Sequence, residues 1–103
     1  MEEQVERFLA ELHETTIAAA DPLADAVDRA RAGDAEAVQE VREGFAELAA
    51  LMGLGLAPRG ARPADAIQES MLVLSELAVA PGDGPFVVKL ARAISARLAT
   101  ISW

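Results

Sequence analysis

The stretch IQESMLVLSELAVA, residues 67–80, is the most apolar run in the chain and determines the fold that we expect. Its two glutamates and its length exclude a bilayer-spanning helix, which needs roughly 20 apolar residues. At about 100° per residue, one broad face of a helix over this stretch is apolar or small. That face consists of Ile67, Ser70, Met71, Val73, Leu74, Leu77 and Ala78. The pattern predicts a helix that is central in a bundle.

Two residues of the same stretch break the pattern. Leu72 and Val79 are seven positions apart, so they nearly superpose along the helix, and both fall within its polar arc. Ile17 lies similarly off the apolar face of the first predicted helix. Apolar residues on the outward side of a helix are typical of contact with a partner. We therefore predict that Leu72, Val79 and Ile17 are interaction residues.

The composition limits the classes of function. The chain of 103 residues predicts a single domain, 1–103, with a core large enough to need no cross-links. It contains no cysteine and only one histidine, His13, which excludes thiolate and multi-histidine metal sites. The first residues, MEEQVERF, do not resemble a secretory signal. We expect a soluble, cytoplasmic protein that does not bind membranes.

The formal net charge of −8 is unevenly distributed. Residues 1–50 contain thirteen acidic and four basic side chains, whereas residues 51–103 contain four and five. An acidic half disfavours nucleic acids as partners, because binding to phosphates depends on lysine and arginine. It favours a partner with a basic protein surface.

The first helical pattern extends from about residue 3 to residue 32 in steps of three and four. Asp21-Pro22 interrupts it and admits two interpretations. One is a single helix that kinks at the proline, and the other is a second helix with Asp21 as its N-cap. In either case the helix should end at Gly33, and Asp34 should cap an antiparallel successor after a tight turn.

Three further segments complete the predicted architecture. The helix that starts at Asp34 should stop at Gly53 with Leu54 folded back, followed by an irregular loop over residues 53–62. Pro63 should open the central helix, and a last, basic helix should cover residues 86–101 beside an acidic one. The fold class is therefore all-α: an up-down bundle of four helices, with the first either kinked or split at Asp21-Pro22.

Signals for chemistry are weak. His13 lies at the edge of an apolar face with no nucleophile or second metal motif nearby, and Arg7, Arg42, Lys89 and Arg92 lie outside the apolar stripes. The sequence thus predicts no catalytic, cofactor-binding or metal-binding residue and favours a non-enzymatic protein over an enzyme.

We expect a helical interaction module, acting as an adaptor, regulator or chaperone-like subunit. Its partner would be a second copy in a homodimer, another protein with a basic surface, or both. The alternative is a small-molecule-binding or enzymatic bundle with a pocket covered by residues 53–62, because this stretch is long and glycine-rich.

Overall fold

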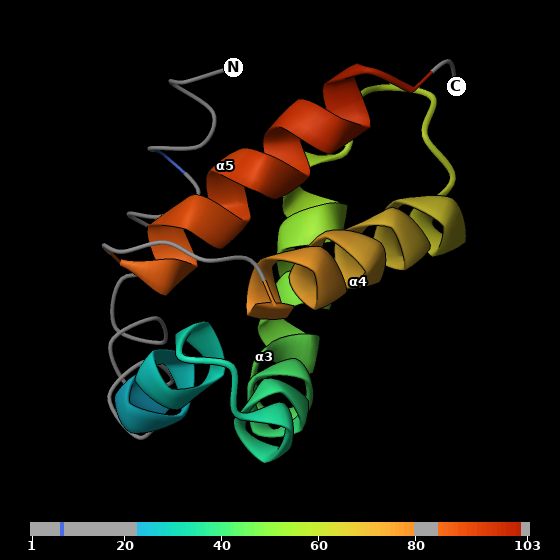
Figure 1. The fold of residues 1–103 in the computed structure, drawn as a ribbon. Coiled ribbons are helices and arrows are strands. Elements are labelled where there is room, and N and C mark those ends of the chain that lie inside the picture. Colours follow the sequence, from blue (N-terminus) through green and yellow to red (C-terminus); the bar gives the residue numbers. More distant parts are fainter. Residues whose placement is uncertain (1–6, 8–22, 80–84, 102–103) are drawn as a thin grey trace.

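The computed structural model describes residue 7 and residues 23–79 and 85–101. Residues 23–79 and 85–101 contain four helical segments and no strand: residues 23–31, α3 (Ala35–Leu56), α4 (Pro63–Val79) and α5 (Phe86–Ala99) (Figure 1). The predicted all-α bundle of four helices is confirmed. The predicted kink or division at Asp21-Pro22 lies outside the described residues.

Each described helical segment runs antiparallel to the one before it. Arg29, near the end of the 23–31 segment, binds Glu40 near the start of α3. Gly53, late in α3, lies against Ala66 and Ser70, early in α4. The antiparallel course of α4 and α5 is visible in Figure 1, where the two helices pass one another in opposite directions. Short connections between antiparallel neighbours are characteristic of up-down bundles.

A three-residue turn joins the 23–31 segment to α3. Gly33 adopts φ 100°, a conformation that costs glycine little because it has no Cβ. Asp34 then caps α3 as predicted, and its Oδ1 accepts hydrogen bonds from the backbone N–H groups of Glu36 and Ala37. Arg29 spans the turn with ion pairs to Asp25, Asp34 and Glu40, and the hydrogen bonds to Asp25 and then Glu40 raise its pKa.

The prediction that α3 stops at Gly53 is wrong. The helix continues through Gly53 to Leu56, and the following Ala57 is extended (φ −62°, ψ 134°) because it precedes Pro58. Gly53 is buried, and a Cβ at this position would lie 2.9 Å from the carbonyl oxygen of Ala66. The glycine therefore permits α3 and α4 to approach each other closely, and the irregular segment shortens to residues 57–62.

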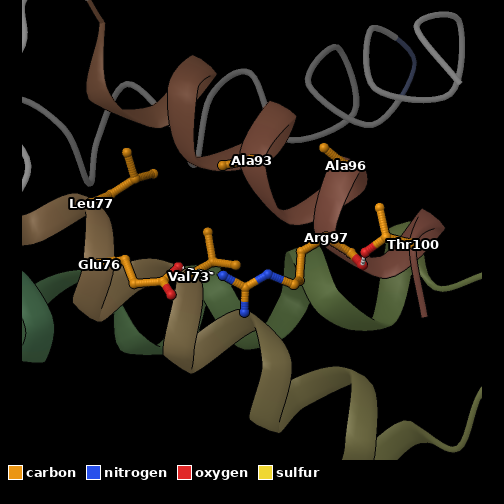
Figure 2. A pocket seen from close by; sticks show the side chains of 7 residues that line it. All are labelled: Val73, Glu76, Leu77, Ala93, Ala96, Arg97 and Thr100. Atoms are coloured by element: carbon orange, nitrogen blue, oxygen red, sulfur yellow. Dashed lines mark hydrogen bonds and ion pairs between the residues drawn. The ribbon is translucent and has the colours of Figure 1, made fainter.

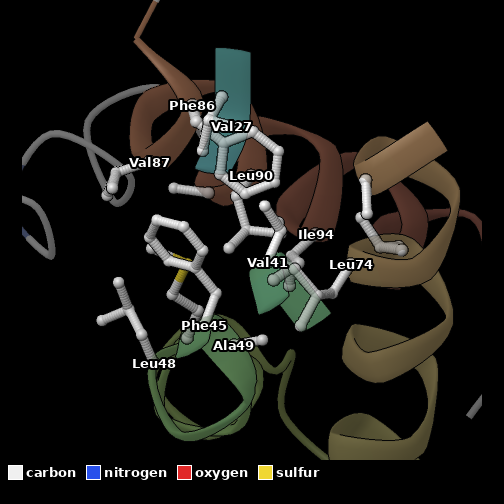
Figure 3. Packing of buried hydrophobic residues seen from close by; sticks show 14 of the residues in the cluster. Val27, Val41, Phe45, Leu48, Ala49, Leu74, Phe86, Val87, Leu90 and Ile94 are labelled. Atoms are coloured by element: carbon white, nitrogen blue, oxygen red, sulfur yellow. The ribbon is translucent and has the colours of Figure 1, made fainter. Parts of the chain in front are cut away.

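The core forms where α3, α4, α5 and the 23–31 segment meet (Figure 3). The rings of Phe45 and Phe86 are 4.9 Å apart and tilted by 44°, a favourable geometry for an aromatic pair. Val27, Leu90 and other aliphatic side chains surround this pair. The predicted stripe of α5 is buried from Val87 to Leu98, although Ile101 is only half-buried.

Candidate functional site

The outward side of α4 carries the two apolar residues that the sequence singled out. Leu72 is 48% exposed and Val79 is 57% exposed. The opposite side of the same helix is buried, and Ser70 at its centre donates a hydrogen bond from Oγ to the carbonyl oxygen of Ala66. A spacing of seven residues places Leu72 and Val79 about 10.5 Å apart along the helix. We refer to these two residues as the α4 strip.

Ile17 lies outside the described residues, so its assignment as an interaction residue stays a prediction. The sequence analysis also missed two exposed side chains of α3, Leu51 at 43% and Leu54 at 47%. The prediction that Leu54 folds back onto the core is wrong, because α3 does not end before it. Leu54 lies about 200° around the helix from the buried Met52, so the helical period would have located it on the outward side once α3 is extended past Gly53.

A groove of about 440 Å³ lies between α4 and α5 (Figure 2). Its apolar walls include Val73 and Leu77 of α4, together with small residues of α5. Arg97 of α5 crosses the groove and donates hydrogen bonds to Glu69 (3.3 Å) and to Glu76 of α4. These ion pairs confirm the prediction that the basic last helix lies beside acidic side chains.

A second groove, of about 420 Å³, lies at the junction of the 33–34 turn, the start of α3 and the end of α4. The described residues that line it are Ala30, Gly33, Ala35, Val38, Arg42 and Val79. Arg42 is half-buried, and its Nε is enclosed with no hydrogen-bond partner among the described residues. A buried donor without an acceptor costs about 1–3 kcal/mol, so this arginine is an incompletely satisfied cation beside one end of the α4 strip.

The described residues contain no arrangement that indicates catalysis. In this part of the chain, no group of three or more histidine, aspartate or glutamate side chains is placed to hold a metal ion. Arg7 and Arg92 are exposed, whereas Arg42 and Lys89 are half-buried, and His13 lies outside the described range. The described residues of neither groove include any of residues 53–62, so the predicted covered pocket has no counterpart in these two sites.

No described helix combines the length and apolarity required to cross a membrane. Comparison of the chain with protein-family models, with curated proteins and with solved structures finds no match. The functional argument therefore depends on the geometry of the surface alone.

Proposed function

We propose that this chain is a non-enzymatic, cytoplasmic helical interaction module, an adaptor, regulator or chaperone-like subunit that associates through the outward side of α4. The observation that carries the proposal is the α4 strip: Leu72 and Val79 are both about half exposed and lie on one line of a helix whose opposite side contributes to the core. Burying such side chains against a partner is favourable by about 25 cal/mol per Å² of apolar surface.

The charges around the strip limit the kind of partner that it can contact. α4 carries three acidic side chains and no basic one, with Glu76 exposed beside the strip. Charges at the edge of an apolar contact guide encounter and select partners more than they add affinity. The acidic edge favours a contact with basic groups, whether these belong to another protein or to a part of a second copy outside its α4.

The proposal is tested by measuring molar mass with light scattering over a concentration series. We expect the wild type to form a homodimer, and Leu72→Glu and Val79→Glu to weaken it, because each places a carboxylate in the contact. Leu51→Glu is the matched control: it adds the same charge at a leucine of similar exposure, but on α3. If the two α4 variants assemble like this control, α4 is not the contact surface.

A further inference from the structure

We propose that the partner of the α4 strip is a second copy of this chain, packed so that the two α4 helices run antiparallel with Leu72 of each copy against Val79 of the other. This inference rests on the proposed function and adds the identity and orientation of the partner. A two-fold axis near Ser75 and Glu76, midway between the two apolar residues, produces both contacts at once. Isologous contacts of this kind are the commonest in homo-oligomers.

The orientation follows from the charge at the Val79 end of the strip. Arg42 lies there, half-buried in the second groove, and its guanidinium forms no ion pair among the residues that the structure describes. In an antiparallel pair the N-terminal half of the other copy's α4 extends beyond Val79 and carries Asp65 toward this arginine, whereas Glu69 is already bound by Arg97 of its own copy. Asp65 is exposed and makes no ion pair within the described part of the chain. Each copy thus brings a carboxylate to Nη1 and Nη2 of the other's Arg42, since the enclosed Nε is out of reach of a second chain.

The parallel alternative is unfavourable for the same reason. It would place the two Val79 ends together and bring Arg42 of one copy near Arg42 of the other. It would also align the two helix dipoles, whereas the antiparallel pair places the positive N-terminus of one α4 near the negative C-terminus of the other. Repulsion between the two Glu76 side chains near the axis is reduced because each is already bound by Arg97 of its own copy.

The orientation is measurable by cross-linking, since the chain has no cysteine of its own. Leu72→Cys and Val79→Cys are prepared separately, mixed and oxidised mildly, and the products are identified by intact mass. A disulfide requires Cα atoms about 4.4–6.8 Å apart, and the antiparallel pair holds equivalent positions about 10 Å apart along the axis. We therefore expect the mixed 72–79 product to dominate, while Leu51→Cys, as the control for random collision, cross-links poorly.

A charge exchange tests the ion pair independently. Arg42→Glu and Asp65→Arg should each weaken dimerisation roughly tenfold, because each places like charges together at two symmetric contacts. The double variant should recover most of the affinity, which a merely structural role of Arg42 would not produce.

Three results would overturn the inference. The wild type could stay monomeric throughout the concentration series, or each single-cysteine variant could cross-link to itself in preference to the 72–79 product. The double variant Arg42→Glu with Asp65→Arg could also dimerise as weakly as the two single variants. If the wild type dimerises and Leu72→Glu disrupts the dimer, the cross-linking and charge-exchange results can refute the antiparallel orientation while the proposed function still holds. If Leu72→Glu leaves the dimer unchanged, the proposed function itself fails.

Discussion

Replacing Gly53 by alanine tests the close approach of α3 and α4. The new Cβ would lie 2.9 Å from the carbonyl oxygen of Ala66 and closer still to Oγ of Ser70, whereas ordinary contact begins at 3.4 Å. α3 and α4 must therefore separate by about 0.5 Å at this point, the difference between those two distances. A gap of 0.5–1 Å removes about a quarter to a half of the dispersion attraction of the atoms that line it.

The expected loss follows from two opposing terms. Overpacking substitutions cost about 1–3 kcal/mol, and the upper part of that range applies because a backbone oxygen cannot rotate away. Alanine in place of glycine inside a helix stabilises the folded chain by about 1 kcal/mol, because its helix propensity is higher. We expect Gly53→Ala to lower the free energy of unfolding by about 1–2 kcal/mol, which corresponds to a decrease in Tm of roughly 4–16 °C for a chain of this size.

Gly44 provides the matched control within the same helix. A Cβ at position 44 would lie 2.5 Å from Cδ1 of Leu23, the far end of a flexible side chain that is able to move. Gly44→Ala gains the same helix propensity of about 1 kcal/mol, and displacing the Leu23 side chain offsets part of it, so the free energy of unfolding should not fall. The measurement is urea unfolding followed by far-UV circular dichroism. If Gly53→Ala is as stable as Gly44→Ala, α3 and α4 do not approach each other this closely in solution. If they do, the double variant Gly53→Ala with Ser70→Ala should recover part of the unfolding free energy that Gly53→Ala loses.

Three further predictions concern the cap, the core and the ion pairs. Asp34→Ala should destabilise the chain by about 1 kcal/mol in urea unfolding, because α3 loses its side-chain cap, whereas Asp34→Asn should retain most of the stability. Phe45→Ala should lower the free energy of unfolding by about 3–5 kcal/mol, and a decrease below about 1 kcal/mol would show that the aromatic pair does not organise the core. Arg97→Met should cost no more than about 1 kcal/mol, since its pairs with Glu69 and Glu76 are partly exposed, and the difference from wild type should shrink in high salt.

The helix boundaries that local chemistry determines could be predicted from the sequence. Asp34 after Gly33 indicates the start of α3, because a carboxylate after a left-handed glycine satisfies the free N–H groups of a first turn. Pro63 indicates the start of α4 because its fixed φ suits the first helical position. The outward position of Leu72 and Val79 also follows from the helical period alone.

The features that depend on contact between helices could not be predicted. Gly53 was expected to end α3, since a glycine after an apolar run is the commonest stop signal. Only the position of Ala66 and Ser70 on the neighbouring helix shows why a glycine is needed here: these two residues leave no space for a side chain at position 53. The groove around Arg42 depends likewise on Val79, which is 37 residues further along the chain, and no local pattern links the two.

The antiparallel succession of helices also has a consequence for the speed of folding. The ion pairs that connect one helix to the next join residues that are close in sequence: Arg29 and Glu40 are 11 residues apart, and Glu76 and Arg97 are 21 residues apart. Helical proteins dominated by such local contacts fold in microseconds to milliseconds, whereas ribosomes add about 5–20 residues per second. Contacts between neighbouring helices can therefore form far faster than the chain is extended, so their formation during synthesis is limited by when each helix becomes available.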